Sequence, residues 1–417
     1  MGKYIVEGNN RLSGEVDIHG AKNAVLPILA AVLLCDDSVR IGNCPHLSDV
    51  EAARNILAHL GRSSHWEGSS LIVDGGAPQM CDIPEKLMRE MRSSIVFLGA
   101  VISRCSTARI SFPGGCELGP RPIDLHLEAL EKMGVKVVED NGFLECSCEK
   151  KLKGAVINLA FPSVGATENI MLAACRADGE TVIHNGAREP EIEDLAGFLN
   201  ACGADISIEP NGTIHIKGVE KLHGAEYDVI PDRIVTVTYM CCSAVTAGEL
   251  LLKSVNVRHL QSVMPIFEQM GCIVKANEDT IYLQAPQRLK AVKCIQTMPY
   301  PGFPTDAQAP LMAAACVASG TSIFIENIFE NRFKHASEFK RMGAEIEVQG
   351  RTAAVHGVSH LHGANVKCTD LRGGAAVLVC ALAAHGTTVV SETEHILRGY
   401  EDIDRRLALL GASIKKA

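Results

Sequence analysis

The chain carries the same pattern of residue types six times, and this repetition constrains its fold more than any other feature. In each copy a helix-like run rich in alanine ends in a short polar turn and continues into a strand-like run. The six turns with their strands read CDDSVRI, RCSTARI, ADGETVI, TAGELLL, ASGTSIF and AHGTTVV, and their turn positions are 66 to 73 residues apart. This regularity predicts six copies of one structural unit.

A second marker recurs in phase with the first and predicts where a helix ends in each copy. Glycine is the residue that most easily closes a helix in the left-handed conformation. After most of these glycines, two short alternating runs flank a turn, as in DISIEPNGTIHI, where Asn-Gly is a strong hairpin signal. Each copy is therefore predicted to read helix, strand, helix, hairpin. The marker glycines are Gly61, Gly134, Gly203, Gly271, Gly343 and Gly411.

The length of 417 residues exceeds what one hydrophobic core usually organises, so two domains are expected. Six units of helices and strands then divide into three per domain, which is typical of an α/β fold. Apolar residues make up 47% of the chain and charged residues 21%, so we expect no long disordered region.

The net charge of −9 argues against nucleic acid or an acidic membrane surface as the main partner, because both require a basic face. The first residues, MGKYIVEGNNRLSG, lack a basic segment followed by an apolar run. Apolar stretches such as Leu26 to Cys35 are too short to span a bilayer. We therefore expect a soluble cytoplasmic protein without a membrane segment, whose oligomeric state the sequence leaves open.

The sixteen cysteines favour a reduced environment rather than a disulfide framework. Most of them, including Cys35, Cys175 and Cys316, fall within apolar helix-like runs, where a thiol acts as a small hydrophobic group. Cys146 and Cys148 are separated by one residue, but no second pair of ligands follows at a spacing typical of metal sites. We expect neither a metal nor a cofactor.

Several alanine-rich runs begin with polar residues, at the position where a helix attracts anions through its free N–H groups and its dipole. Ser, Thr and Asp at such positions are explained as helix caps. Lys22 and Arg372 are not, because a cation opposes the dipole. Each indicates either a bound anion shared with the helix end or a solvated surface charge. The polar residues at these starts are Lys22, Asn23, Arg92, Ser163, Thr167, Asp306, Gln308, Asp370 and Arg372.

One cysteine lies in a different setting, within the stretch FPGGCELGPRPIDLHLEAL from Phe112 to Leu130. Cys116 follows two glycines in a turn rich in proline and precedes Arg121 by five residues. A thiol in such a loop is accessible, and a nearby guanidinium influences its charge state. Arg332 and Arg398 also lie in turns, and arginine suits bidentate contact with phosphate or carboxylate. Taken together, these residues favour a small polyanionic substrate.

These motifs resemble a known family. The runs GAKNAVLPILAA, PGGCELGPRPIDLHL, FPSVGATENIM, PTDAQAP, ENRFKHASEF and LRGYEDID, in this order, are similar to those of the UDP-N-acetylglucosamine enolpyruvyl transferases of the EPSP synthase superfamily. The resemblance covers essentially the whole chain and implies a two-domain inside-out α/β barrel with three repeats per domain. It implies one domain at residues 22–229, carrying the cysteine loop, and a second at residues 1–21 plus 230–417.

The implied reaction transfers the enolpyruvyl group of phosphoenolpyruvate to the 3-hydroxyl of UDP-N-acetylglucosamine and releases phosphate, the first committed step of peptidoglycan synthesis. By resemblance, Cys116 is the general acid and the target of the epoxide fosfomycin, and Asp306 is the general base. Lys22 and Arg398 act with them on phosphoenolpyruvate. The residues expected to bind the two substrates are Lys22, Asn23, Arg92, Arg121, Pro122, Ile123, Asp124, Leu125, Ser163, Val164, Gly165, Asp306, Ile328, Arg332, Asp370, Arg372 and Arg398.

Two departures from the family pattern leave alternatives open. The segment from Ile234 to Thr238 reads IVTVT where many members have a glutamate, a small residue and glycine, and Ala160 stands where several members have a charged residue. One alternative is a regulatory paralogue that binds a nucleotide sugar. The other is 5-enolpyruvylshikimate-3-phosphate synthase, which lacks a cysteine loop of this kind.

Overall fold

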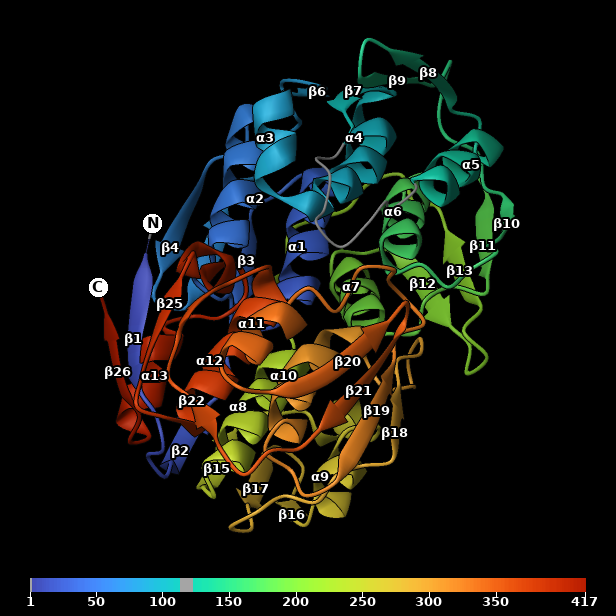
Figure 1. The fold of residues 1–417 in the computed structure, drawn as a ribbon. Helices are drawn as coiled ribbons and strands as arrows, with labels where there is room; N and C mark the ends of the chain where they lie inside the picture. Colours follow the sequence, from blue (N-terminus) through green and yellow to red (C-terminus); the bar gives the residue numbers. More distant parts are fainter. Residues whose placement is uncertain (1, 113–122) are drawn as a thin grey trace. The chain divides into compact units, whose positions relative to one another are not determined.

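The computed structural model describes residues 2–112 and 123–417, and within them the chain forms two compact units. Unit A comprises residues 20–112 and 123–230. Unit B comprises residues 2–19 and 231–417, so it contains the first strands of the sequence as well as its second half (Figure 1).

Unit A contains three modules, each with a first helix, a strand, a second helix and a hairpin, completed by a leading strand (Figure 1). The first module consists of α1 (Lys22–Ala31), the 3₁₀ helix η1 (Val32–Leu34), β3 (Val39–Gly42), α2 (Ser48–His59), β4 (Ser64–Glu67), β5 (Ser70–Val73) and β14 (Glu226–Asp228). The second consists of β6 (Asp82–Ile83), α3 (Glu85–Glu90), the 3₁₀ helix η2 (Arg92–Val96), α4 (Phe97–Cys105), β7 (Thr107–Ser111), α5 (Asp124–Lys132), β8 (Lys136–Asp140) and β9 (Phe143–Ser147). The third consists of β10 (Val156–Asn158), α6 (Val164–Ala174), β11 (Glu180–His184), α7 (Pro190–Ala201), β12 (Asp205–Ile208) and β13 (Ile214–Lys217).

Unit B repeats the same module three times. Its first module consists of β2 (Ser13–Asp17), α8 (Arg233–Val245), β15 (Glu249–Lys253), the 3₁₀ helix η3 (Val257–Leu260), α9 (Met264–Gln269), β16 (Ile273–Ala276) and β17 (Thr280–Gln284). The second consists of β18 (Cys294–Gln296), α10 (Thr305–Ala315), β19 (Thr321–Ile325), α11 (Ala336–Arg341), β20 (Glu345–Gln349) and β21 (Thr352–His356). The third consists of β1 (Lys3–Glu7), β22 (Leu361–His362), β23 (Asn365–Lys367), α12 (Leu371–Ala383), β24 (Ala384–His385), β25 (Thr387–Ser391), the 3₁₀ helix η4 (Thr393–Arg398), α13 (Ile403–Leu409) and β26 (Ser413–Lys416).

The same four-stranded sheet recurs in every module. The leading strand runs parallel to the strand after the first helix; for example, Val156 in β10 pairs with Val182 in β11. The second hairpin strand runs antiparallel to the strand after the first helix, and His215 in β13 pairs with the same Val182. Strands from elsewhere in the chain complete three of the sheets. β14 leads the first sheet of unit A, β2 leads the first sheet of unit B, and β1 lies between β25 and β26.

Each unit has its own hydrophobic core, built around its first helices. In unit A these are α1, α4 and α6, which contact one another in every pairing, and in unit B α8, α10 and α12 do the same. The helices are buried along most of their length, and their many alanines allow close approach of the backbones. The sheets lie around the helices, so the expected inside-out α/β architecture is confirmed (Figure 1).

The marker glycines behave as predicted, whereas one predicted helix is wrong. All six close their helices with φ between 88° and 101°, in the left-handed region. The helical spacing of apolar residues predicts one helix over Val257 to Met270, but the structure has η3 and α9 there. Pro265 stands in the first turn of α9 and has no N–H with which to continue a preceding helix.

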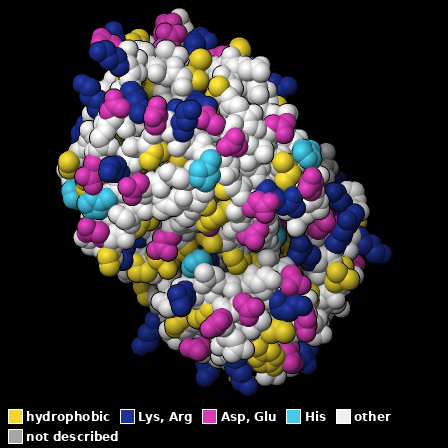
Figure 2. Space-filling model, turned by 180° about the vertical axis from the view of Figure 1, so that it is seen from behind, with side chains coloured by type: hydrophobic (Ala, Val, Ile, Leu, Met, Phe, Trp, Pro, Cys, Tyr) yellow, Lys and Arg dark blue, Asp and Glu magenta, His cyan; other side chains and the backbone are white. Residues whose placement is uncertain are grey.

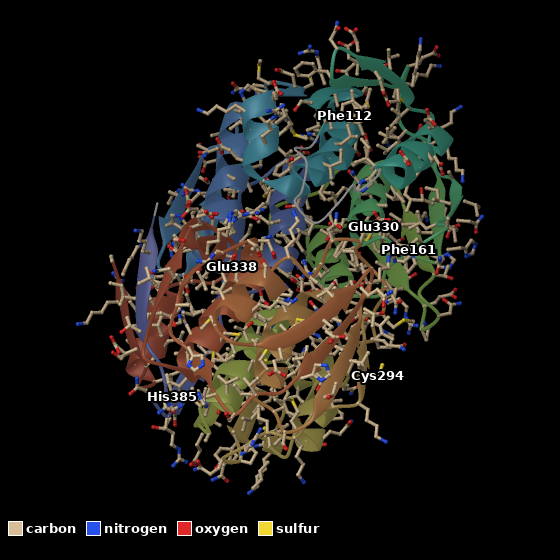
Figure 3. All side chains as sticks on the ribbon, viewed as in Figure 1. Phe112, Phe161, Cys294, Glu330, Glu338 and His385 are labelled. Atoms are coloured by element: carbon tan, nitrogen blue, oxygen red, sulfur yellow. The ribbon has the colours of Figure 1, made fainter. Side chains whose placement is uncertain are left out.

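The distribution of surface charge and the state of the described cysteines agree with what the composition indicated. On the face shown in Figure 2, Lys and Arg side chains are interspersed with Asp and Glu over the described residues, and no extended basic patch is visible. The described cysteines are free thiols, most of them buried, while Cys294 in β18 is exposed (Figure 3). Within residues 2–112 and 123–417, no helix has the length and apolar character needed to cross a bilayer.

Candidate active site

The residues predicted to bind substrate fall into two groups, one in each unit. In unit A they lie at or next to the first residues of α1, η2, α5 and α6. In unit B they lie around the starts of α10 and α12, in the segment that follows β19, and at the end of η4. Cys116, Arg121 and Pro122 lie outside the described residues. The unit A residues are Lys22, Asn23, Arg92, Ile123, Asp124, Leu125, Ser163, Val164 and Gly165, and the unit B residues are Asp306, Ile328, Arg332, Asp370, Arg372 and Arg398.

Lys22 forms an ion pair that the sequence did not reveal. Its Nζ lies 2.9 Å from Oδ2 of Asp49 in the first turn of α2, and the two side chains are 11% and 3% exposed. The protein therefore provides a carboxylate for the cation at the start of α1, and the position of Lys22 no longer requires a bound anion. Asp49 was missed because an acidic residue in a first helical turn is typical of simple helix stabilisation.

Asp306 is held by two arginines in unit B. Arg332 Nη2 donates to Oδ1 at 2.8 Å, and Arg372 Nε donates to Oδ2 at 3.1 Å. Both arginine side chains are 3% exposed, whereas the carboxylate is 27% exposed. Each carboxylate oxygen thus accepts from one guanidinium, and the group remains accessible to a ligand.

Arg372 is itself fixed by buried neighbours. Its guanidinium lies 5.5 Å from the ring centroid of Tyr400, and the Tyr400 hydroxyl is 2.9 Å from Oγ1 of Thr238. Burial lowers the pKa of Arg372, but the effects of Asp306, Tyr400 and Asp232 together outweigh it, and the pKa lies above its usual range. Thr238 is the last residue of the unusual IVTVT segment, which forms a buried part of α8. The segment therefore belongs to the support of this cluster.

Asp370 is the N-cap of α12. Its Oδ1 accepts from the backbone N–H groups of Arg372 at 3.1 Å and Gly373 at 3.0 Å. Burial raises the pKa of Asp370, but the charge of Arg332 and these hydrogen bonds bring the pKa below its ordinary value. Burial also lowers the pKa of the neighbouring His335 to about 4, although Asp370 acts in the opposite direction. Asp370 is therefore a charged cap that orients the start of α12.

A buried glutamate shapes the segment that carries Ile328. Glu326 Oε1 accepts from the N–H groups of Ile328 at 2.8 Å and Phe329 at 3.0 Å, and from the Thr297 hydroxyl at 2.9 Å. The other oxygen accepts from Thr305 Oγ1 at 3.0 Å, next to Asp306. Glu326 thus links this segment to the start of α10. No sequence signal indicated Glu326, because a single glutamate at a strand end is typical of a solvated surface charge.

In unit A, the start of α6 has the features of an anion-binding helix end. Ser163 is the N-cap, and its Oγ accepts from Ala166 N at 3.4 Å. The Thr167 hydroxyl donates to Ser163 O at 2.8 Å and accepts from Ala187 N at 3.0 Å, which ties the turn to the segment after β11. The N–H groups of Val164 and Gly165 belong to the first turn, where the dipole favours negative charge.

Comparison with solved structures defines the class of fold. The enolpyruvyl transferase NikO from Streptomyces tendae matches 100% of this chain and 99% of its own with a TM-score of 0.90 and 26% identity. An EPSP synthase from Acinetobacter baumannii matches 100% of both chains with a TM-score of 0.77 and 19% identity, and shows the fold alone. The fold is that of the enolpyruvyl transferases.

Sequence comparison then narrows this class. The EPSP synthase (3-phosphoshikimate 1-carboxyvinyltransferase) family model matches residues 6–407. A relative from Caldanaerobacter subterraneus, named UDP-N-acetylglucosamine 1-carboxyvinyltransferase 2, is 50% identical over 414 residues and 99% of both chains. A Staphylococcus saprophyticus protein of the same name is 44% identical over 99% of this chain and 98% of its own. The chain belongs to the EPSP synthase family and, within it, to the UDP-N-acetylglucosamine 1-carboxyvinyltransferases.

Proposed function

We propose that the protein transfers the enolpyruvyl group of phosphoenolpyruvate to the 3-hydroxyl of UDP-N-acetylglucosamine and releases phosphate. The observation that carries this proposal is the 50% identity, over 99% of both chains, to a relative named for that activity. The reaction serves peptidoglycan synthesis, and we place it in the cytoplasm, in keeping with the many free thiols. We also propose residues 22–229 and residues 1–21 plus 230–417 as the two catalytic domains. Two separate hydrophobic cores support this division.

The first chemical step is an addition to the enol double bond. The sugar oxygen bonds to the enol carbon, a proton is added to the methylene carbon, and the hydroxyl proton leaves. We assign delivery of the proton to Cys116, which lies outside the described residues, and its removal to Asp306. The partial exposure of Asp306 and its two arginine partners support this assignment, because the carboxylate is oriented and still reachable.

The second step restores the double bond. Phosphate leaves the former enol carbon, and the carbon that gained a proton loses one. Lys22, Arg121 and Arg398 are assigned to the phosphate and carboxylate of phosphoenolpyruvate, with Asn23 beside them. At Lys22 an incoming phosphate adds to the existing ion pair with Asp49 rather than meeting an isolated cation.

The nucleotide sugar is assigned to the helix starts of unit A, together with Ile328 of unit B. Free N–H groups at the start of α6 support contact with anionic oxygens. Arg332, Asp370 and Arg372 are assigned to positioning, because their described contacts go to Asp306 and to the start of α12. The remaining residues assigned to the nucleotide sugar are Arg92, Pro122, Ile123, Asp124, Leu125, Ser163, Val164 and Gly165.

The deciding experiment measures phosphate release from phosphoenolpyruvate with UDP-N-acetylglucosamine as acceptor and, in parallel, with shikimate 3-phosphate. We expect turnover with the nucleotide sugar alone. Turnover with shikimate 3-phosphate alone assigns the sister activity, and no turnover with either rejects the enzyme proposal and favours a regulatory paralogue. Fosfomycin is expected to add to Cys116 in the presence of nucleotide sugar, and a peptide map without that adduct contradicts the role given to this thiol.

A further inference from the structure

One buried asparagine in unit A joins the elements to which we assigned the nucleotide sugar. Asn169 in α6 is fully buried. Its Nδ2 donates to Ile95 O in η2 at 2.9 Å, and its Oδ1 accepts from Gly99 N in α4 at 2.5 Å. The same Nδ2 lies 2.8 Å from Nδ1 of His126 in α5. A single side chain therefore bonds to η2, α4 and α5 from its position in α6.

Each of three elements in this network carries residues assigned to the nucleotide sugar. η2 begins at Arg92, α5 begins at Asp124, and α6 begins at Val164. α6 packs against η2, α4 and α5. A shift at Asn169 therefore changes the spacing of these helix starts relative to one another.

The hydrogen bonds also fix the protonation of the histidine. The Asn169 oxygen must face the Gly99 N–H and its NH2 must face the Ile95 carbonyl, so the amide has only one acceptable orientation. That NH2 group then donates to His126 Nδ1, which has to be the unprotonated nitrogen. The proton of neutral His126 is thus assigned to Nε2. His126 is 6% exposed, and burial lowers its pKa to about 4, so the ring is neutral near pH 7.

Two glycines show how closely the network is packed. A β-carbon at Gly165 would lie 3.2 Å from Cε1 and 3.5 Å from Nε2 of His126, so the imidazole rests directly on the first turn of α6. A β-carbon at Gly99 would overlap the backbone oxygen of Asn169, so α4 and α6 are in direct backbone contact. Neither contact leaves space for a water molecule to replace a lost side-chain bond.

We propose that Asn169 and His126 are positioning residues that set the spacing of the nucleotide-sugar subsite in unit A, an inference that rests on the proposed function. Neither residue acts on phosphoenolpyruvate. Lys22, assigned to that substrate, pairs instead with Asp49 in α2.

The test compares Asn169→Asp with Asn200→Asp. A carboxylate at 169 keeps the acceptor for Gly99 N–H but loses both donated bonds. Asn200 in α7 is a solvent-exposed control for the same chemical change in the same unit, because its amide makes two bonds to the backbone of Ile206, at 2.8 and 2.9 Å. We expect the KM for UDP-N-acetylglucosamine to rise about tenfold in Asn169→Asp, with the KM for phosphoenolpyruvate changed less than twofold. Asn200→Asp should change neither.

A second pair of variants tests the histidine. Asn at position 126 can place an oxygen near Nδ1 and accept from Asn169, whereas Leu cannot. His126→Asn should therefore keep the nucleotide-sugar KM within about threefold of wild type, and His126→Leu should raise it about tenfold. Nitrogen NMR of labelled histidine should show a proton on Nε2 of His126 in wild type and on Nδ1, or on both nitrogens, in Asn169→Asp.

Equal rises of both KM values in Asn169→Asp, or lower stability with both KM values unchanged, overturn the positioning role. A proton on Nδ1 in the wild type overturns the hydrogen-bond assignment. Wild-type turnover with an unchanged nucleotide-sugar KM in Asn169→Asp rejects this inference alone. Absence of wild-type turnover rejects the proposed function and the subsite with it.

Discussion

Replacing Asp306 with Asn should destabilise unit B as well as impair the reaction. The substitution leaves the guanidinium groups of Arg332 and Arg372 buried without their carboxylate. Removing one partner of a buried ion pair typically costs about 3 to 5 kcal/mol. Because the Asp306 side chain is 27% exposed and partly solvated, the lower end of that range applies, about 3 kcal/mol. Arg372→Met removes one of the two cations and should by itself cost about 1 to 2 kcal/mol.

The double variant Asp306→Asn/Arg372→Met distinguishes this reasoning from simple loss of packing. It leaves one buried guanidinium without the Asp306 carboxylate instead of two, so its cost should be smaller than the sum of the single costs by about 1 to 2 kcal/mol. Hydrogen exchange followed by mass spectrometry on peptides from α10 and α12 measures the local free energy of opening, and peptides from α1 and α6 serve as internal controls. Costs that add within about 0.5 kcal/mol would falsify the proposed coupling.

Three further predictions follow from single contacts. The pKa of His335 is lowered to about 4, so as pH falls below about 6.5 the unfolded chain binds a proton before the folded chain does. The free energy of unfolding of unit B should therefore fall by about 2 kcal/mol between pH 7.5 and 5. Chemical denaturation of His335→Gln should not show this loss. Asp49→Asn removes the negative charge 2.9 Å from Lys22, so the KM for phosphoenolpyruvate should fall and depend more steeply on salt; a higher KM contradicts this. Gly165→Ala places a β-carbon 3.2 Å from the His126 ring. In steady-state assays this variant should raise the KM for the nucleotide sugar about threefold. An unchanged KM would show that the ring can move away freely.

The local features of the fold were predictable because each depends on a few adjacent residues. Gly343, for example, closes its helix at φ 90°, as the sequence indicated. The leading strands were missed because segments such as Val156–Asn158 and Cys294–Gln296 are three residues long, too short for a recognisable period. The break at Pro265 was missed because the apolar residues on both sides of this proline share one helical spacing.

Site residues were predictable only where the signal lies in a few adjacent residues of the sequence. Polar residues at helix starts mark Lys22 and Asp306, and the structure places both there. Their partners come from distant parts of the chain: Asp49 is 27 residues from Lys22, and Arg372 is 66 residues from Asp306. Pairing over such separations depends on tertiary packing, which no local pattern encodes. The roles of individual residues in the reaction stay predictions.

The two strands that precede unit A have a consequence for synthesis of the protein. β2 pairs with β15 and β1 with β25 and β26, all of which follow unit A in the sequence. At about 5 to 20 residues per second, a ribosome needs on the order of half a minute to supply β25 after β1. Unit A can fold during that interval, while the first strands keep their hydrogen-bonding edges unpaired. The interval between synthesis of β1 and synthesis of β25, which covers most of translation, is therefore a period in which these first strands can pair with the edge of another chain.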